Sequence, residues 1–374
     1  MIATFKPSIK RKDMDSVLSC LVSDVIGPAG LSERLLKVLS ERLNGSGGYA
    51  LREYPRAIAV ALEALGVQPG ARVALSPLLP WVYHYVCVNL GLEPVYVDVD
   101  ADSPVIDLDQ LQVLEGLAAA VVPATLGYSV DLERLGGLGI PLIEDVSQGL
   151  GATSGSLAVG SVGQYTICGL EPEHIITAGG GAALMARGRK ERAALKTIAE
   201  RLPAEVFLPD MNAALGLIQA LEVERLNERR REIAAVYAQS TAQSHHKTPV
   251  QHGDARSICF SYPVFVESGA RDVIAYARKK DVEVIPAFVR SILGRTAAAR
   301  EAADQSPMGG TRSADGAAVA TGAASVAAAE PCLPRESMLP NGRGFLLRCL
   351  LFPLYPMLKK DEVALVQKVL STIP

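Results

Sequence analysis

An acidic residue at the end of a short apolar segment is the first candidate for chemistry in this chain. Pro141–Glu144 (PLIE) has the length and composition of a buried strand, and Asp145 follows it directly. Ligands of parallel sheets bind beyond the carboxyl ends of the strands. Asp145 is therefore a candidate ligand-binding residue, although an Asp in this position is also a common helix cap or turn former.

The histidines form a second group of candidates. His174 could shuttle a proton near neutral pH, or it could be an ordinary hydrogen-bonded loop residue. His245, His246 and His252 lie in a polar stretch in which no carboxylate or cysteine recurs at ligand spacing, so no metal site is expected. The six cysteines contain no C-x-x-C pair, and we expect reduced packing residues rather than a disulfide framework.

The elements that must position Asp145 alternate between strands and helices. The predicted strands are Arg72–Leu75, Pro94–Val99, Ala118–Pro123 and Pro141–Glu144, and the predicted helices are Ala57–Leu65, Trp81–Leu90 and Val130–Leu135. Strands separated by helices predict an α/β fold in which helices cover both faces of a mainly parallel sheet.

A long helix, Asn212–Gln239, is expected to bridge this large domain (residues 1–240) to a smaller C-terminal α+β domain (241–374). In the smaller domain we predict strands Ser257–Val266, Val282–Ile285 and Phe345–Leu351 and helices Asp272–Lys280 and Asp361–Leu370. Residues 296–341 resemble an insert. Within them Thr296–Glu330 is rich in Ala, Gly and Ser and is predicted to be mobile or irregular.

Composition sets the outer limits. The 374 residues are 49% hydrophobic and 21% charged, enough to bury a large core. With 37 Lys and Arg against 40 Asp and Glu, the net charge of −3 provides no bulk attraction for nucleic acid or an anionic membrane. No apolar run approaches the ~20 residues of a membrane helix, and no signal core follows the basic first residues. A cytoplasmic protein is expected.

Several segments share a pattern with a known family. The most specific is LIEDVSQGLGA at 142–152, against the family signature I-E-D-x-A-Q-x-x-G-A. The others are LGVQPG at 65–70, GLEPVYVD at 91–98, AALGLIQ at 213–219, ERRREIAAVY at 228–237 and LFPLYP at 351–356. Together they resemble the DegT/DnrJ/StrS family of sugar aminotransferases, which are fold-type I enzymes dependent on pyridoxal phosphate (PLP). The resemblance implies a three-layer α/β/α large domain and a homodimer.

The resemblance also assigns roles to residues. Asp145 matches the carboxylate that pairs with the pyridinium nitrogen of the cofactor, and Gln148 matches the contact to the ring hydroxyl. Trp81 occupies the position of the aromatic residue that stacks on the ring, although a lone Trp is more often a core residue. Whether His84, close to Trp81, faces the cleft or the core stays open.

Other positions depart from the family pattern. The phosphate-binding S-G-T falls on 53–55 (EYP), where Glu53 would repel a phosphate and Pro55 lacks an N–H donor. The Schiff-base lysine falls on His174, or on Glu173 if the alignment is ungapped, and neither forms the internal aldimine. The phosphate-binding Ser falls on Cys168 or Gly169, and the family's N-Y-R falls near residues 205–207. The phosphate site of PLP or of pyridoxamine phosphate (PMP) is thus expected to be lost.

Three functions follow from these similarities and departures. The first is a degenerate member of the nucleotide-sugar aminotransferase family without transaminase activity, which binds a sugar nucleotide or serves as a non-catalytic subunit in polysaccharide biosynthesis. The second is a sugar dehydratase in which His174 acts as the base on substrate bound to exchangeable PMP. The third, ordinary nucleotide-sugar transamination, is disfavoured by the missing lysine.

Overall fold

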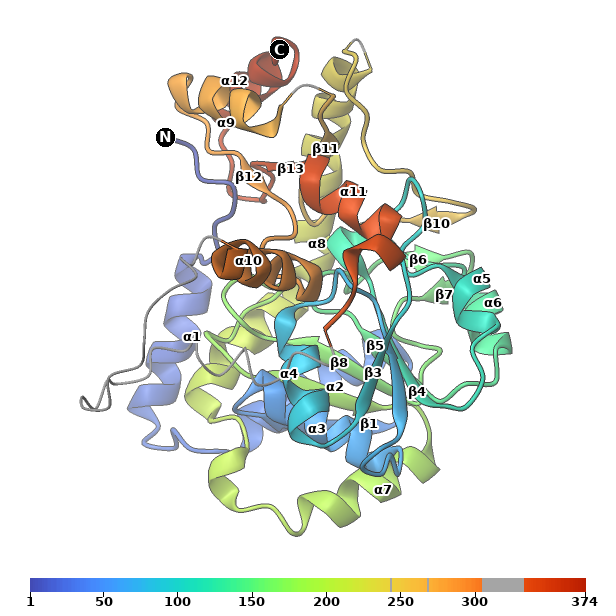
Figure 1. Ribbon diagram of the computed structural model, residues 1–374. Helices are drawn as coiled ribbons and strands as arrows, with labels where there is room; N and C mark the ends of the chain where they lie inside the picture. The colour runs from blue at the N-terminus through green and yellow to red at the C-terminus, as the bar shows by residue number, and fades with distance from the viewer. Residues whose placement is uncertain (243, 268, 305–332) are drawn as a thin grey trace, which may run out of the picture.

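A seven-stranded sheet forms the centre of the larger lobe (Figure 1). The computed structural model describes residues 1–242, 244–267, 269–304 and 333–374. In spatial order the strands are β1 (Gly47–Leu51), β9 (Ala182–Ala186), β8 (Tyr165–Gly169), β5 (Leu142–Asp145), β4 (Leu117–Pro123), β2 (Arg72–Leu75) and β3 (Glu93–Tyr96). The five strands from β8 to β3 are parallel, whereas β9 runs antiparallel to both β8 and β1. The expected mainly parallel sheet is confirmed.

Side chains along each strand point alternately to the two faces of the sheet, and each face packs against its own apolar layer. Val121 and Ile143 point to one face, whereas Val122 and Leu142 point to the other, and all four are buried. Helices α3 (Tyr54–Ala64), α4 (Trp81–Asn89) and α7 (Arg189–Ala199) cover the first face, and α2 (Gly30–Leu43) and the start of α8 (Asp210–Thr241) cover the second. Fully burying one such aliphatic side chain stabilises the fold by roughly 1.5–3 kcal/mol.

The remaining elements of the larger lobe lie around this sandwich. Helix α1 packs on α8, and a small antiparallel sheet of β10, β6 and β7 flanks the main sheet. Their bounds are α1 Arg11–Val22, α5 Leu108–Gln112, α6 Leu132–Gly137, β6 Thr153–Ser154, β7 Leu157–Ala158 and β10 Ala255–Arg256. Among the helices of the described residues, none is long and apolar enough to span a membrane.

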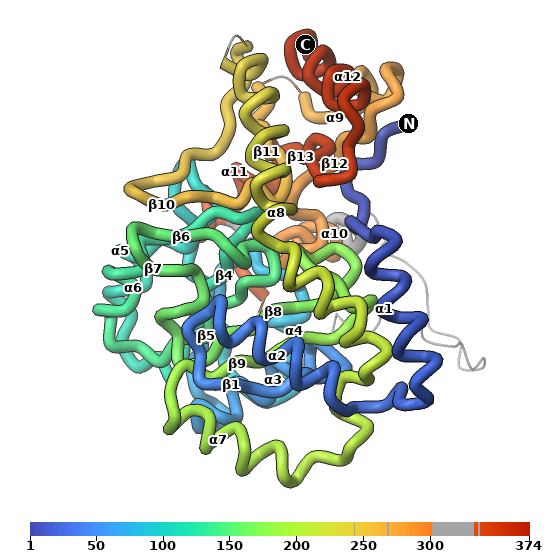
Figure 2. Tube along the Cα trace, turned by 180° about the vertical axis from the view of Figure 1, so that it is seen from behind, coloured from blue at the N-terminus to red at the C-terminus, as the bar shows by residue number. Residues whose placement is uncertain are grey.

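The smaller lobe is an antiparallel sheet of β11 (Tyr262–Phe265), β13 (Cys349–Phe352) and β12 (Ile285–Pro286). Helices α9 (Ala270–Lys279) and α12 (Lys360–Leu370) pack on it with the end of α8, which runs from one lobe into the other (Figure 2). Ile2 forms a parallel bridge with Val282, so both chain termini lie in this lobe. The proposed boundary near residue 240 stays a prediction.

Three predictions about the second half of the chain need correction. Phe345–Leu351 is not one strand, because α11 (Pro340–Arg348) precedes β13. The carboxylate of Asp98 accepts the N–H groups of Asn341 and Gly342 at 2.9 and 2.8 Å, and this cap from a distant segment stabilises the start of α11. Of the expected strand over 257–266, only the β11 residues are extended in a ladder. Of the expected strand Val282–Ile285, only Ile285 belongs to β12.

The segment predicted to be irregular from Thr296 onward begins inside a helix. Helix α10 spans Ile292–Asp304, and its Thr296 is buried, with its hydroxyl donating to the carbonyl of Ile292 at 2.8 Å. The prediction was therefore wrong for residues 296–304, since alanine favours a helix once one face is packed. Residues 305–332 lie outside the described part of the chain.

Candidate functional site

Asp145 lies at the carboxyl end of β5, where the strand pattern predicted it, and its carboxylate is buried. Oδ1 accepts the backbone N–H of Ser147 at 2.7 Å. Oδ2 accepts two phenol hydroxyls, that of Tyr83 at 2.7 Å and that of Tyr54. Both oxygens of the carboxylate thus have donors supplied by the fold itself.

The two tyrosines come from the helices on one face of the sheet. Tyr54 is the first residue of α3 and Tyr83 lies in α4, with their rings edge to face at 6.0 Å between centroids and their hydroxyls 3.3 Å apart. Burial, reinforced by the negative charge of Asp145, raises the pKa of Tyr54 and of Tyr83 well above the ordinary value. Both phenols therefore keep their protons and remain donors to Asp145.

His174 lies on the loop that follows β8, the strand next to β5. Its ring stands edge-on to Tyr54 at 5.2 Å between centroids. It also lies directly against Gly169, where a Cβ atom would come within 2.3 Å of the imidazole. Nδ1 accepts the N–H of Glu171 at 3.2 Å, which assigns the proton of a neutral ring to Nε2. Burial lowers the pKa of His174, although the nearby carboxylate of Asp145 opposes the shift.

Glu173, the other residue aligned with the family lysine, is directed elsewhere. Its carboxylate accepts two hydrogen bonds from the same guanidinium nitrogen of Arg290, at 2.7 and 2.6 Å, and both side chains are exposed. Of the two aligned residues, His174 is thus the one whose side chain contacts the Asp145 cluster through Tyr54.

Trp81 and Gln148 contact residues outside the Asp145 cluster. The Trp81 ring packs on His84 at 4.4 Å between centroids, and the guanidinium of Arg295 lies 5.7 Å from the Trp81 ring centroid. His84 is buried and hydrogen-bonded to the hydroxyl of Tyr96 at 2.6 Å, so it faces the core. The side-chain oxygen of Gln148 accepts the N–H of Leu126 at 2.8 Å and holds a loop residue with a positive φ of 53°.

The segment aligned with the family phosphate cradle begins α3. Glu53 is the N-cap residue, is exposed, and makes no side-chain cap hydrogen bond. Pro55 occupies the first turn and lacks a backbone N–H. Near the position of the family's N-Y-R, Phe207 packs on Tyr49 with ring centroids 5.9 Å apart.

A wide surface depression of about 780 Å³ lies between α2 and β1, with Phe207 and Arg192 at its border. None of the four residues carried over from the family lines it. This depression is therefore separate from the Asp145 cluster.

Several residues of this cluster could not be found from the sequence. Tyr54 was recognised only as a departure from the phosphate motif, and neither Tyr83 nor Ser147 stood out. The position of Tyr83 two residues after Trp81 is the one signal available, and it does not distinguish a core tyrosine from a site tyrosine.

Comparisons with known proteins agree with this architecture. The chain is 27% identical over 260 residues to the UDP-4-amino-4-deoxy-L-arabinose–oxoglutarate aminotransferase of Shewanella sediminis (strain HAW-EB3), covering 62% of this chain and 67% of that one. It superposes with a TM-score of 0.82 on Spr1654 of Streptococcus pneumoniae, described as a sugar aminotransferase, in its PMP form. That match has 18% identity and covers 98% of this chain and 96% of the other.

Another solved structure with the same fold is the GDP-4-keto-6-deoxymannose-3-dehydratase ColD, in a histidine-to-asparagine mutant with bound GDP-perosamine. The TM-score is 0.80 at 14% identity, over 99% of this chain and 100% of the other. The model of the DegT/DnrJ/EryC1/StrS aminotransferase family matches residues 9–309, most of the chain. This protein belongs to the DegT/DnrJ/EryC1/StrS aminotransferase family.

Proposed function

We propose that this member of the family does not transaminate and that it binds a sugar nucleotide beside Trp81 without PLP. The observation that carries the proposal is the Asp145 carboxylate, whose oxygens accept two buried phenols and a backbone N–H. In the family pattern this carboxylate pairs with the cofactor ring nitrogen. Here the tyrosines supply donors that a pyridinium would have to replace.

Other residues are equally poorly suited to the cofactor. No lysine lies within 168–181, so that loop offers no amine for an aldimine. At the start of α3, Glu53 adds negative charge and Pro55 removes a donor where a phosphate would need backbone N–H groups. Each charge-assisted hydrogen bond that is missing costs roughly 1.5–3 kcal/mol of binding free energy. The residues present therefore do not fit PLP or PMP.

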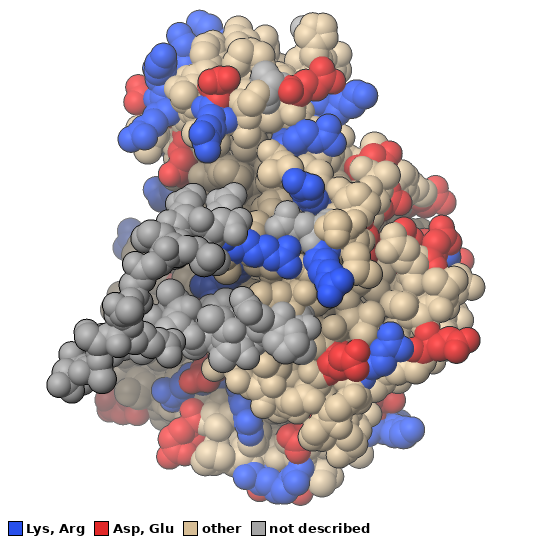
Figure 3. All heavy atoms as spheres, viewed as in Figure 1, with Lys and Arg blue, Asp and Glu red and all other residues tan. Residues whose placement is uncertain are grey.

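Binding of an anionic, ring-containing ligand is supported by the surroundings of Trp81. Figure 3 shows Lys and Arg side chains across the middle of the molecule, where α10 and α11 run in Figure 1. The arginines in and beside these helices include Arg290, Arg295, Arg343 and Arg348. Arg295 lies against the partly exposed ring of Trp81. Guanidinium groups match a diphosphate, and an indole stacks on a base or sugar face.

Calorimetric titration with PLP and with PMP tests the cofactor half of the proposal. We expect dissociation constants no tighter than about 1 mM, or about −4 kcal/mol, because the phosphate contacts are missing. Micromolar binding of either form would contradict the proposal.

A reconstruction experiment tests the same point from the other side. His174→Lys alone should give no transaminase activity, because Tyr54 and Glu53 still occupy the family cofactor positions. Replacing 53–55 (EYP) by S-G-T in the same chain should tighten PLP binding at least tenfold, since it removes a charge, a phenol and a proline. If His174→Lys alone restored turnover, the assignment of the 53–55 segment would be wrong.

The ligand half is tested with UDP-glucose and GDP-mannose as probes. We expect saturable binding of at least one of them, weakened about tenfold or more by Trp81→Ala and by Arg295→Ala, which is at least 1.4 kcal/mol. Arg201→Ala is the matched control, because Arg201 is an exposed arginine paired with Glu63 on another part of the surface. If none of the three substitutions changed the affinity for the sugar nucleotide, the ligand would bind elsewhere.

A His174-dependent sugar dehydratase is the second candidate function. It is supported by the contact of His174 with the Asp145 cluster and by the likeness of the fold to a sugar dehydratase. Micromolar PMP binding, together with proton exchange on a bound sugar that His174→Ala abolishes, would favour it over the first proposal.

We also propose that two copies of the chain form a homodimer, and that this dimer is cytoplasmic. The support is an exposed apolar stripe on and after α1, which includes Met14, Leu18, Val22, Val25 and Ile26. An isologous contact between two copies would cover this stripe. Light scattering coupled to size exclusion should give twice the chain mass of 39.5 kDa, whereas a single-chain mass would refute the dimer.

A further inference from the structure

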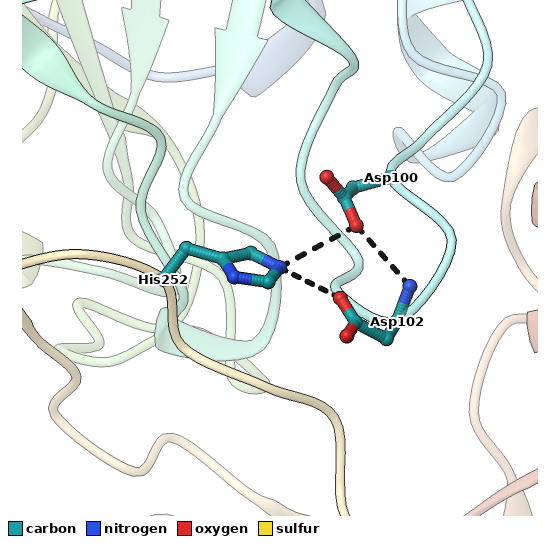
Figure 4. A group of neighbouring side chains, drawn as sticks. All are labelled: Asp100, Asp102 and His252. Carbon is teal, nitrogen blue, oxygen red and sulfur yellow. Dashed lines mark hydrogen bonds and ion pairs between the residues drawn. The ribbon is translucent and has the colours of Figure 1, made fainter.

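Three side chains from two distant segments converge at the surface, and none of them belongs to the Asp145 cluster (Figure 4). Nε2 of His252 lies 2.6 Å from Oδ1 of Asp102 and 3.5 Å from Oδ1 of Asp100. All three side chains are about half exposed. A single ring nitrogen thus faces two carboxylate oxygens, and the three atoms lie within 4.8 Å of one another.

The two segments are fixed to the protein independently of these side chains. The N–H of Val250 donates to the carbonyl of Asp102 at 2.8 Å. Next to His252, the amide of Gln251 exchanges two hydrogen bonds with the backbone of Ser129, at 2.9 and 3.2 Å. These backbone contacts therefore hold the imidazole close to the two carboxylates, so a bound ion would not have to order the loop first.

The donor set has the chemistry of a transition-metal site. One imidazole nitrogen and two carboxylate oxygens are ligands that Zn²⁺ and Mn²⁺ accept, whereas Ca²⁺ and Mg²⁺ favour oxygen ligands alone. Metal–ligand bonds of about 2.0–2.2 Å in a tetrahedron separate neighbouring ligand atoms by roughly 3.3–3.6 Å. The 3.5 Å pair already has this spacing, and the 2.6 Å pair would open by less than about 1 Å.

We propose that Asp100, Asp102 and His252 form a surface site for one divalent transition-metal cation of the Zn²⁺ or Mn²⁺ type. The cation ties the 249–253 loop to the loop that follows β3. Three protein ligands leave at least one coordination position open to solvent. The site goes beyond the proposed sugar-nucleotide function and does not depend on it.

In the metal-free protein a proton takes the place of the cation. Partial burial opposes protonation, but the hydrogen bond that His252 donates to Asp102 and the charges of Asp102 and Asp100 raise the pKa of His252. A cation must displace this proton, so metal affinity should fall as the pH drops through the raised pKa of His252. The same two carboxylates thus interact with either the protonated imidazole or the metal cation.

The test is Mn²⁺ binding to the full chain at pH 7.5, monitored by electron paramagnetic resonance. We choose Mn²⁺ because thiols compete poorly for this ion. We expect one Mn²⁺ per chain, displaced by Zn²⁺, which the same ligands hold more tightly. His252→Gln and Asp102→Asn should each weaken binding at least tenfold. His245→Gln is the matched control, since His245 is an exposed histidine of the same stretch outside the cluster.

A second measurement follows the loop itself. Limited proteolysis within residues 244–254 should slow at least threefold when Zn²⁺ is added to the unsubstituted chain and should not change in His252→Gln. Circular dichroism checks that each variant is folded, as expected for exposed positions. No saturable binding of Mn²⁺ or Zn²⁺ below about 1 mM, or unchanged binding in His252→Gln, would overturn the site.

Discussion

Two carboxylate clusters of this chain differ in their hydrogen-bonding partners and in their exposure to solvent. Around Asp145 the partners are phenols and a backbone N–H that are buried with it. Around Asp100 and Asp102 the partner is the titratable ring of His252, and solvent reaches all three side chains. Burial makes the first carboxylate a part of the core, whereas exposure leaves the second pair free to exchange one cation for another.

The largest expected difference between the clusters is in stability. Asp145→Ala leaves the buried Tyr83 hydroxyl and the Ser147 N–H without an acceptor, and it leaves the Tyr54 hydroxyl with only the long 3.3 Å contact to Tyr83. We expect it to lower the free energy of unfolding by about 3–5 kcal/mol. Asp100→Ala, in the exposed cluster, should change it by no more than about 0.5 kcal/mol. Urea denaturation of both variants measures this contrast. Similar losses in the free energy of unfolding for the two variants would show that burial does not make Asp145 more important for stability than Asp100.

Packing around His174 gives the next largest effect. In Gly169→Ala the new methyl group would meet the imidazole at 2.3 Å and the hydroxyl oxygen of Ser147 at 2.8 Å. We expect a loss of about 1–3 kcal/mol in the free energy of unfolding and a displaced His174 signal in the NMR spectrum. Gly137→Ala is the control, because a Cβ at Gly137 meets nothing within 4 Å. If both variants were equally stable, the close contact with His174 would be refuted.

A smaller effect is expected when only one phenol hydroxyl is removed. Tyr83→Phe keeps the ring and leaves Asp145 with Tyr54 and Ser147, so the loss should be about 1–2 kcal/mol. Tyr85→Phe, on the exposed side of the same helix, should be close to neutral. Equal denaturation midpoints for the two variants would argue against the hydrogen bond to Asp145.

The smallest effect is a difference in titration between two histidines. The pKa of His174 should lie below the ordinary value of about 6.5 and that of His252 above it, as NMR titration can measure. The stability that His252 contributes is fully present below the unfolded pKa and is lost as the pH rises through its raised folded pKa. Asp102→Asn should return the His252 pKa toward 6.5. A His252 pKa at or below that value in the unsubstituted chain would contradict the ion pairing.

Much of the larger lobe could be predicted from local patterns. The alternation of strands β2, β4 and β5 with helices was read from apolar periodicity, and the structure confirms it, because period-2 and period-3.6 patterns report which face of an element is buried. The position of Asp145 after β5 follows from the same pattern. The smaller lobe was harder, since α11 depends on a cap from Asp98, more than 240 residues away.

The sequence by itself determined family membership, the parallel sheet, the absence of a lysine in 168–181 and the position of Asp145 at a strand end. Only the tertiary structure decided what surrounds the carboxylates. Tyr54 and Tyr83 reach Asp145 because α3 and α4 pack on the same face of the sheet, and His252 reaches Asp102 from 150 residues away. Such contacts depend on how whole elements pack, and no short-range pattern of residues encodes that packing.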